Sequence, residues 1–222
     1  MKIFIVIPLF NEEKYIAQVI NDLDTFKLPV VVVDDGSTDN SLQKLSGSKN
    51  QKLILLEHKI NLGKGAAMKT GADFAFSKGA DAVIFMDSDR QHEVGDLTKF
   101  INGLESGKYD VIFGTRNYNY GVPLVRYLGN KFASILLRMM FGIFVTDVLC
   151  GYKGLTKAAY KKLLWSSSGY GVETEIVARA GKAKLKFLEV PIQTIYHEKD
   201  KGVTILDAFG ILVQVIGWKF TI

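Results

Sequence analysis

Short apolar runs alternate with segments of helical period through the first half of the chain. Five runs have the length and composition of buried strands, and they cover residues 2–8, 29–34, 52–58, 81–87 and 110–115. Helical patterns follow the first four runs, over residues 12–26, 38–45, 65–77 and 94–104. Strands this uniformly apolar are typical of a sheet that is covered on both faces. The pattern predicts an α/β fold with a mostly parallel central sheet and helices on both faces, in which ligands bind beyond the carboxyl ends of the strands.

The pattern changes after Thr115. A polar, aromatic stretch is followed by a long apolar segment from Leu124 to Val145, which we expect to be helical. The polar residues of this segment recur at spacings of three and four and would form one narrow stripe, made of Tyr127, Lys131, Ser134 and Arg138. A second apolar segment runs from Ile205 to Ile222. Apolar faces this broad suit either core helices or amphipathic helices at a membrane interface, and the pattern leaves both open.

The composition is that of one well-buried globular domain. The chain has 222 residues, of which 48% are hydrophobic and 23% charged. No stretch reaches the ~20 apolar residues of a membrane-spanning helix, and the apolar start is too short and wrongly flanked for a signal peptide. The single cysteine, Cys150, excludes an intramolecular disulfide framework and favours a reducing compartment. We therefore expect a cytoplasmic protein.

The charge is distributed unevenly along the chain. Residues 1–110 carry 13 Lys and Arg against 16 Asp and Glu, whereas residues 111–222 carry 15 against 7, so the halves have net charges of −3 and +8. A basic half of this kind suits nucleic acid, an anionic membrane surface or a phosphorylated substrate. We expect no nucleic-acid partner, because helix-turn-helix, RNP and zinc patterns are absent from the sequence.

The strongest chemical signal is MDSDRQH, which ends the fourth apolar run. Asp87 and Asp89 leave that strand on the same side, because residues two apart in a strand face the same way. Two such carboxylates can bind one hard divalent cation and leave coordination positions for a diphosphate and water. A solvated turn that caps the next helix is the alternative. The position at the end of the fourth strand, together with the motifs at the other strand ends, favours the cation site.

Two other strand ends carry polar residues. Asp35 follows the second run, and its carboxylate suits hydrogen bonds from a base or a ribose, whereas the Ser-Thr pair after it suits helix capping. After the first run, Pro8 fixes the exit of the strand, and Asn11 and Glu12 face the same crevice. Glu12 is equally suited to be a first-turn acid that interacts with the helix dipole.

The segment NLGKGAAMKTG resembles a phosphate-binding loop only loosely. It fits neither the P-loop pattern nor the dinucleotide-binding glycine pattern. Lys64 within it is placed to reach a phosphate, and the alternative is a solvated loop lysine.

Taken together, the segments IPLFNEE, VVVDDGSTDNS, NLGKGAAMKTG and MDSDRQHE resemble in order and spacing the family 2 glycosyltransferases, and the resemblance spans essentially the whole chain. Later segments look more narrowly like the polyprenyl-phosphate branch, the dolichyl-phosphate mannose or glucose synthases, namely GTRNYNYGVPLVRYLGN, TDVLCGYKG, GYGVETEIVARA and LEVPIQTIYHEKDKGVTILDA. The resemblance implies a GT-A type fold with C-terminal amphipathic helices. It also implies one domain over residues 1–222, with a nucleotide-sugar-binding half at 1–115 and an acceptor-binding half at 116–222.

The resemblance assigns roles to individual residues. The residues that would hold the nucleoside are Pro8, Asn11, Glu12 and Asp35. The residues that would hold Mg²⁺ or Mn²⁺ and the diphosphate are Asp87, Asp89 and Gln91. The basic residues that would face the phosphates of donor and acceptor are Arg116, Arg126 and Lys201.

The activity implied by the resemblance is inverting, metal-dependent transfer of a hexose from a GDP-mannose or UDP-glucose type donor to a polyprenyl or dolichyl phosphate. Such an acceptor is ionised at neutral pH and needs no strong base. For a hydroxyl acceptor, Asp147 is the candidate base, with a structural hydrogen-bonding acid as the alternative. The apolar segments and the basic half then predict peripheral binding to the anionic, cytoplasmic face of a membrane.

Three alternative functions remain open. A soluble family 2 transferase acting on a sugar or protein hydroxyl would share the donor site and differ only after residue 115. A sugar nucleotidyltransferase would need a glycine- and arginine-rich loop after the first strand, where PLFNEE stands. A non-catalytic nucleotide-sugar-binding protein would more naturally lack one of the metal ligands, all of which are present.

Overall fold

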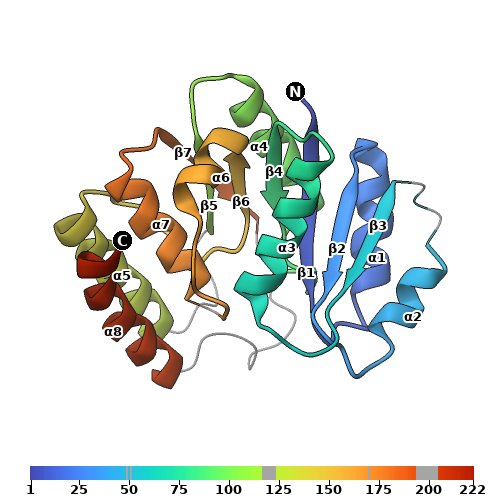
Figure 1. Ribbon diagram of the computed structural model, residues 1–222, viewed down its shortest axis with the longest axis horizontal. Helices are drawn as coiled ribbons and strands as arrows, with labels where there is room; N and C mark the ends of the chain where they lie inside the picture. Colours follow the sequence, from blue (N-terminus) through green and yellow to red (C-terminus); the bar gives the residue numbers. More distant parts are fainter. Residues whose placement is uncertain (49, 51, 117–123, 170, 194–204) are drawn as a thin grey trace.

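The computed structural model describes residues 1–48, 50, 52–116, 124–169, 171–193 and 205–222. These residues form a seven-stranded sheet with the order β3-β2-β1-β4-β6-β5-β7. The strands are β1 (Ile3–Leu9), β2 (Val30–Asp34), β3 (Leu53–Glu57), β4 (Ala82–Phe85), β5 (Val111–Arg116), β6 (Lys153–Thr156) and β7 (Phe187–Ile192). Neighbouring strands are parallel, except that β6 is antiparallel to β4 and β5. The predicted α/β fold with a mostly parallel sheet is confirmed (Figure 1).

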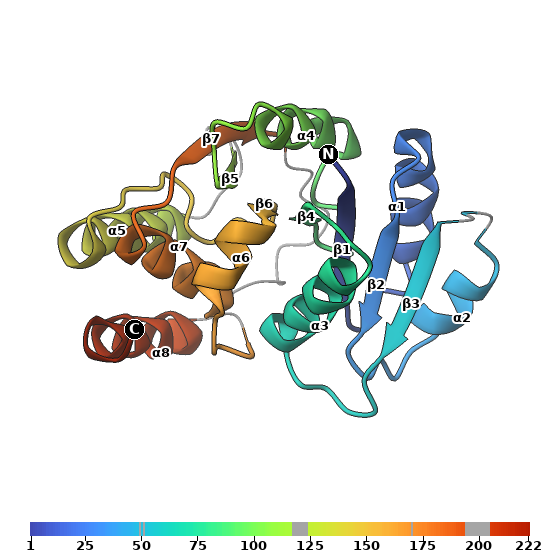
Figure 2. The ribbon, with the colours of Figure 1, turned by 45° about the horizontal axis from the view of Figure 1, so that its top comes forward.

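Helices cover both faces of the sheet (Figure 2). They are α1 (Ile16–Leu23), α2 (Ser41–Ser46), α3 (Lys64–Ser77), α4 (Leu97–Glu105), α5 (Leu124–Phe141), α6 (Lys157–Leu163), α7 (Val172–Lys182) and α8 (Ile205–Thr221). Short 3-10 turns are formed by Asp24–Phe26 and Val94–Asp96. Residues of α1, α2 and α4 build the core on one face, and residues of α3, α5, α6, α7 and α8 build the core on the other.

The first strand contributes to both cores. All of its residues are buried. Phe4 and Val6 belong to one core, and Ile5 and Ile7 belong to the other, because successive side chains of a strand point to opposite faces. This double burial explains why the strand is apolar throughout instead of alternating with polar residues.

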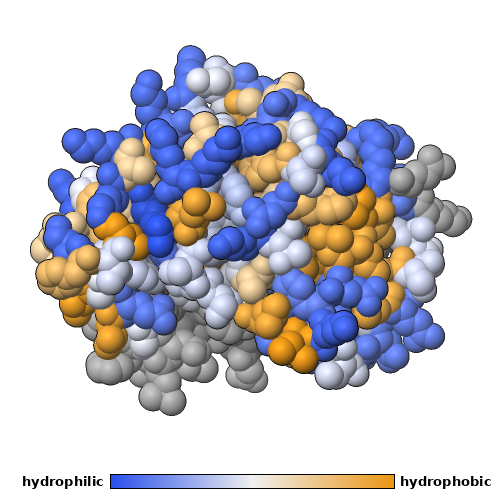
Figure 3. Space-filling model, viewed as in Figure 1, coloured by the Kyte–Doolittle hydropathy of each residue, from blue (hydrophilic) through white to orange (hydrophobic). Residues whose placement is uncertain are grey.

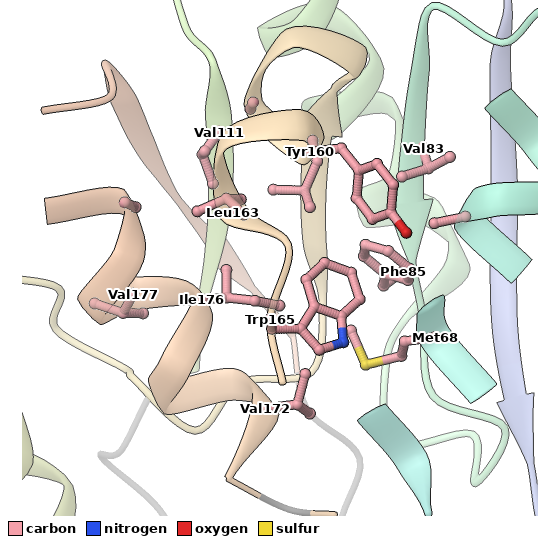
Figure 4. Packing of buried hydrophobic residues seen from close by; sticks show 14 of the residues in the cluster. Met68, Val83, Phe85, Val111, Tyr160, Leu163, Trp165, Val172, Ile176 and Val177 are labelled. Atoms are coloured by element: carbon pink, nitrogen blue, oxygen red, sulfur yellow. The ribbon is translucent and has the colours of Figure 1, made fainter. Parts of the chain in front are cut away.

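Trp165 joins the two halves of the chain in one core (Figure 4). Its ring packs edge-on against Phe85 and Tyr160, with ring centroids 5.9 and 5.4 Å away. Its indole N–H donates to the carbonyl of Gly65 at 2.9 Å. The segment after α6 is therefore fixed against the start of α3.

The predicted long helix differs from α5 in two ways. The helix ends at Phe141 because Gly142 adopts a φ of 71°, a left-handed conformation that commonly ends helices. Ser134 was expected to share a narrow polar stripe with exposed residues such as Lys131 and Arg138, but it is buried. Its hydroxyl donates to the Asn130 carbonyl at 3.0 Å. Among the described residues, no helix is both long enough and apolar enough to cross a membrane.

Candidate functional site

The sheet has a topological switch point between β1 and β4. β1 pairs with β2 on one side and with β4 on the other. The strands β2 and β3 therefore extend the sheet to one side of β1, and β4 extends it to the other side. Ligands of α/β sheets bind in the crevice that forms at the carboxyl ends of such strands. The loops after β1, β2 and β4 carry three of the predicted groups of site residues, and the structure therefore brings these groups to one edge.

Asn11 joins the loops that follow β1 and β2. Its φ of 54° lies in the left-handed region, which Asn adopts more readily than most residues. Its side-chain oxygen accepts hydrogen bonds from the backbone N–H groups of Thr38 at 2.8 Å and Asp39 at 3.3 Å. Asn11 thus stabilises the wall of the crevice, and a direct contact to a nucleoside stays a prediction.

Pro8 and Glu12 frame the same strand end. Pro8 is buried in β1 beside Val33 of β2. The backbone N–H of Glu12 donates to the Ser41 hydroxyl at 2.8 Å, and its carbonyl accepts from the N–H of Ile16 at 3.1 Å. Glu12 lies four residues before α1 begins at Ile16, and the first turn of α1 contains no acid, so the first-turn alternative is wrong. Its contact to a nucleoside stays a prediction.

Asp35 uses both carboxylate oxygens within the protein. Oδ1 accepts from His58 Nδ1 at 2.7 Å and from the N–H of Leu62 at 2.9 Å. Oδ2 accepts from the N–H of Gly63 at 2.7 Å. The residue is only 2% exposed. Asp35 therefore holds the loop that leads into α3, and its predicted contact to a base or ribose remains untested.

The neighbouring Asp34 keeps one oxygen available. Asp34 ends β2 beside Leu9 of β1, and its Oδ2 accepts from the N–H of Ser37 at 3.1 Å. Its Oδ1 is buried and has no hydrogen-bond partner within the described part of the chain. Such an oxygen costs free energy unless a donor reaches it. Asp34 is therefore a better candidate than Asp35 for accepting a hydrogen bond from a ligand.

A lysine bridges two carboxylates at the end of β4. Lys64 Nζ lies 2.7 Å from Asp87 Oδ1 and 2.6 Å from Glu173 Oε1. Burial raises the pKa of Asp87, but the Lys64 ammonium outweighs it and holds the pKa at about 2. Burial lowers the pKa of Lys64, but Asp87 and Glu173 outweigh it and raise this pKa above its ordinary value. Lys64 and Asp87 are therefore both charged at neutral pH.

Asp89 and Gln91 lie immediately beyond Asp87. Asp89 Oδ1 accepts from the backbone N–H of Gln91 at 2.9 Å, so the carboxylate also shapes this turn. Burial, followed by the negative charge of Asp87, raises the pKa of Asp89 above its ordinary value. Two partly buried carboxylates that disfavour each other's charge are stabilised when a divalent cation binds between them.

The donor atoms of this segment fit a hard divalent cation. Asp87 and Asp89 provide carboxylate oxygens and Gln91 provides an amide oxygen, which are the ligand types preferred by Mg²⁺ and Mn²⁺. Asp87 already binds one cationic group, the Lys64 ammonium. Among the described side chains, no three acids, histidines or cysteines form a group able to hold a metal. An ion bound here would therefore need further ligands from a diphosphate and water.

An aromatic stack supports the loop after β4. His92 Nε2 lies 3.7 Å from Asp87 Oδ2, and the His92 ring stacks on Tyr152 with centroids 5.0 Å apart. Tyr152 in turn stacks on Phe100 at 4.1 Å. Burial lowers the pKa of His92 and outweighs the opposing effects of Asp87 and Asp89. The carboxylates therefore rest on a rigid base that contains a neutral imidazole.

Arg116, at the end of β5, and Asp147 form a two-pronged ion pair. Arg116 Nε lies 2.6 Å from Asp147 Oδ2, and a terminal guanidinium nitrogen lies 2.9 Å from Oδ1. Asp147 is 1% exposed. This fork fixes the guanidinium and agrees with the structural alternative for Asp147, while its role as a base stays a prediction. Arg126 lies in the first turn of α5 with its side chain outside the described part, and Lys201 lies outside the described residues.

Three residues of the site were not predicted as functional from the sequence. Asp34 adjoins the selected Asp35, and only the hydrogen bonds of the loop distinguish the two acids. Glu173 lies in the first turn of α7, a helix that the apolar pattern did not predict. His92 carries no spacing signal of its own, because its stacking partner Tyr152 is distant in the sequence.

Comparison with known proteins gives consistent matches. The sequence model of "Glycosyl transferase family 2" matches residues 4–164. An uncharacterised protein of Methanocaldococcus jannaschii is 35% identical over 228 residues, covering 98% of this chain and 92% of that protein. The UDP-N-acetylglucosamine--dolichyl-phosphate N-acetylglucosaminyltransferase of Methanococcus voltae is 31% identical over 240 residues, covering 98% and 96%. Glucosyl-3-phosphoglycerate synthase from Mycobacterium tuberculosis, solved with Mn²⁺, UDP-glucose and phosphoglyceric acid, is similar in structure with a TM-score of 0.70 at 20% identity, over 97% of this chain and 80% of that chain.

Proposed function

This chain belongs to glycosyltransferase family 2 and has a GT-A type fold, and from that membership we propose that it transfers a hexose from a nucleoside-diphosphate sugar to a polyprenyl phosphate with inversion. The observation that carries the proposal is the Asp87 carboxylate, which lies beside Asp89 at the switch point of the sheet and binds a cationic group at 2.7 Å. The proposal treats residues 1–222 as one domain, with its donor half at 1–115 and its acceptor half at 116–222.

The nucleoside of the donor is assigned to the crevice at the ends of β1 and β2. Asp34 offers its buried Oδ1, which has no hydrogen-bond partner among the described residues, to an N–H group of the base. Asp35 and Asn11 keep the surrounding loops in place through their own hydrogen bonds. The Methanococcus voltae relative is named for a UDP sugar, and the Mycobacterium tuberculosis structure contains UDP-glucose. These names support a nucleoside-diphosphate sugar, and the donors to test first are GDP-mannose, UDP-glucose and UDP-N-acetylglucosamine.

The diphosphate is assigned to the segment after β4. Asp87, Asp89 and Gln91 would hold Mg²⁺ or Mn²⁺, and the bound ion would neutralise charge on the departing diphosphate. The Mn²⁺ in the Mycobacterium tuberculosis structure supports a divalent ion of this kind. Lys64 adds a positive charge from the start of α3. Direct attack by the acceptor on the anomeric carbon, opposite the diphosphate, inverts the configuration.

The acceptor phosphate is assigned to Arg116. Asp147 holds the guanidinium through bonds of 2.6 and 2.9 Å, and an arginine oriented in this way is suited to binding a phosphate. A phosphate acceptor is already ionised, so it does not need Asp147 as a base. The name of the Methanococcus voltae relative includes dolichyl phosphate as acceptor, which supports this choice. Arg126 and Lys201 stay predicted ligands of the same phosphates.

An exposed apolar ridge on α5 and α8 suits contact with a membrane. The two helices pack side by side against α7, and Figure 3 shows apolar side chains at the edge of the molecule where Figure 1 draws them. The exposed apolar residues of this ridge are Leu128, Phe132, Ile135 and Met139 on α5 and Val213, Ile216 and Phe220 on α8. Their spacings of three and four place them along one side of each helix.

The charge around this ridge favours an anionic lipid surface. Lys131 and Arg138 are exposed on α5 among the apolar residues, and basic residues beside an apolar helix face attract anionic lipid. A polyprenyl phosphate keeps its chain in the bilayer, so an enzyme that uses it must bring its site to the interface. We therefore place the enzyme at the cytoplasmic face of a membrane, bound peripherally through this ridge.

A transfer to a sugar or protein hydroxyl is the second candidate function. It would use the same donor site, and Asp147 would then have to leave Arg116 to act as a base. A non-catalytic nucleotide-sugar-binding protein would bind donors without turning them over. Product analysis with lipid phosphate and with water-soluble acceptors separates the three possibilities.

Thermal unfolding with donors and metals tests the donor site. The purified chain is heated with GDP-mannose, UDP-glucose or UDP-N-acetylglucosamine, each with and without Mg²⁺ or Mn²⁺. A ligand that binds only the folded state raises the melting temperature, and we expect at least one donor to do so more strongly with metal. Failure of all three donors with both metals would contradict the proposed donor site.

A further inference from the structure

The Lys64 ammonium connects three elements that come from both halves of the chain. Lys64 begins α3, Asp87 follows β4, and Glu173 lies in the first turn of α7. The Lys64 nitrogen lies 2.7 Å from Asp87 and 2.6 Å from Glu173. The Glu173 side chain is 5% exposed, whereas those of Lys64 and Asp87 are about one-fifth exposed, at 20% and 22%. The bridge therefore has a buried end at Glu173 and an accessible end at Asp87.

The backbone around this bridge is held by the segment before α7. A Cβ at Gly65 would lie 2.1 Å from the Ser167 carbonyl oxygen, so α3 begins in tight contact with the segment before α7. The N–H of Ser167 donates to Glu175 at 2.7 Å, and the Trp165 indole donates to the Gly65 carbonyl at 2.9 Å. The Lys64 stem has four rotatable carbons, and its ammonium can rotate between acceptors.

Glu173 has an unused acceptor beside the bridge. Its Oε1 pairs with Lys64, but its Oε2 is buried and has no hydrogen-bond partner among the described residues. A carboxylate in the first turn of a helix is favoured by the helix dipole. Glu173 can therefore keep the ammonium when Lys64 leaves Asp87.

We propose that the Lys64 ammonium occupies the metal-facing side of Asp87 in the free enzyme, and that Glu173 is the positioning residue that holds Lys64 when the metal takes its place. The proposal rests on the proposed function, because it requires Asp87 to be a metal ligand. Lys64 and a divalent cation compete for Asp87 Oδ1, since two cations on one oxygen repel each other. Glu173 then keeps the displaced ammonium at the edge of the site, where it faces the diphosphate of the donor.

Binding of Mn²⁺ alone, measured by electron paramagnetic resonance without nucleotide, tests the competition. Lys64→Met removes the competitor, so we expect Mn²⁺ to bind on the order of tenfold more tightly, within the usual range of coupling between two ligands. Glu173→Gln leaves Lys64 paired with Asp87 alone, so Mn²⁺ should bind several-fold more weakly. Lys69→Met, which removes an exposed lysine from the same helix, is the matched control and should leave the affinity unchanged.

The double variant Lys64→Met/Glu173→Gln tests whether Glu173 acts on the metal through Lys64 or directly. If Glu173 acts through Lys64, Glu173→Gln has no effect on Mn²⁺ affinity once Lys64→Met is present. If Glu173 contacts the metal or acts only by its charge, the substitution weakens binding equally in both backgrounds, and this result would overturn its assignment. Circular dichroism and thermal unfolding establish that each variant is folded. Lys64→Arg keeps the positive charge, so it should bind Mn²⁺ as weakly as the wild type does.

Asp89→Ala distinguishes failure of this inference from failure of the metal site itself. If Asp89→Ala binds Mn²⁺ as well as the wild type does, the metal assignment in the proposed function fails. If Asp89→Ala loses Mn²⁺ binding but Lys64→Met gains none, the metal site stands and the competition by Lys64 is refuted.

Discussion

Gly151 lies directly against the carboxylate of Asp87, where a Cβ atom built on Gly151 would stand 2.3 Å from Oδ2. The antiparallel pairing of β4 and β6 explains the contact. Phe85 pairs with Lys153, and the same register carried two residues further brings Asp87 opposite Gly151. The second half of the chain therefore shapes the proposed cation site by leaving space for the Asp87 carboxylate of the first half.

The Gly151→Ala variant tests this contact. The added methyl group has to displace the carboxylate, because atoms in a packed site cannot approach to 2.3 Å. We expect metal-dependent donor binding to weaken by about tenfold or more, equivalent to about 1.4 kcal/mol. Calorimetric titration of the donor with Mn²⁺ measures the change.

Gly129→Ala is the matched control for this variant. A Cβ at Gly129 meets nothing within 4 Å, and the residue is exposed on α5. Replacement of a helical glycine by alanine should stabilise the fold by about 0.5–1 kcal/mol and leave donor binding unchanged. Equal donor affinities for the two variants would show that Gly151 does not shape the site.

Asp34 and Asp35 should give different defects. Asp35→Ala removes an acceptor of three hydrogen bonds at a residue that is 2% exposed, so unfolding in urea should become easier by about 2–4 kcal/mol. Asp34→Asn keeps the size of the side chain but changes the hydrogen-bonding character of its unpartnered oxygen. We expect it to raise the Michaelis constant for the donor with little change in stability or turnover number. If Asp35→Ala raised the Michaelis constant and Asp34→Asn lowered the stability, the nucleoside contact would belong to Asp35.

The acid stability of the fold should depend on Glu175. Burial raises the pKa of Glu175, but hydrogen bonds from Ser167, Ser166 and Arg179 outweigh it and hold the pKa below its ordinary value of 4.5. A carboxyl with a lowered pKa stabilises the folded state above its unfolded pKa, and this contribution is lost as the pH falls through the folded value. Urea unfolding of the wild type and Glu175→Gln should therefore differ most near pH 7 and converge below pH 4.5. A difference that stays constant with pH would exclude the charge of Glu175 as the cause.

Membrane binding should depend on the apolar ridge of α5 and α8. Phe132 is 56% exposed on this ridge, and Ile60 is 66% exposed in the loop before α3. Flotation with anionic vesicles should show salt-sensitive binding of the wild type. Phe132→Glu should weaken this binding by about tenfold or more, because a charge replaces apolar area that the membrane would bury. Ile60→Glu, the same change away from the ridge, should float like the wild type. Wild-type protein that stays with the buffer at low salt, or that forms a dimer through this ridge, would contradict the membrane assignment.

The sheet of the first half was predictable because its strands are buried on both faces. The runs that became β1 and β2 are apolar apart from the terminal Asp34, and this pattern indicates a parallel sheet without knowledge of any contact. The short β6 was not predicted, because its sequence KGLT contains a lysine that is buried within the sheet. Lys153 is accommodated there because its ammonium donates to the Val148 and Cys150 carbonyls, which is a tertiary property.

The site was predictable to the level of its segments. Asp87 and Asp89 were selected from their position after a buried strand, and the structure brings them to the switch point together with Asn11. The choice between Asp34 and Asp35 depends on which carboxylate the loop uses. Glu173 approaches Lys64 only because the start of α7 lies beside the start of α3. Contacts between residues this distant in sequence leave no periodic signal in either segment.

Transfer of a labelled hexose to a polyprenyl phosphate by the wild type and by Asp89→Asn is the most direct measurement of the proposed activity. The assay uses the donor that raises the melting temperature most, together with Mn²⁺ and lipid acceptor in anionic vesicles. The wild type should form lipid-linked hexose, and removal of the metal with a chelator should abolish the product. Asp89→Asn should fold normally and retain at most about a hundredth of the wild-type rate, because the proposed metal ligand loses its negative charge. A rate of this variant above about a tenth of the wild-type rate would contradict the metal dependence. A wild type that glycosylates only water-soluble hydroxyl acceptors would contradict transfer to a lipid phosphate.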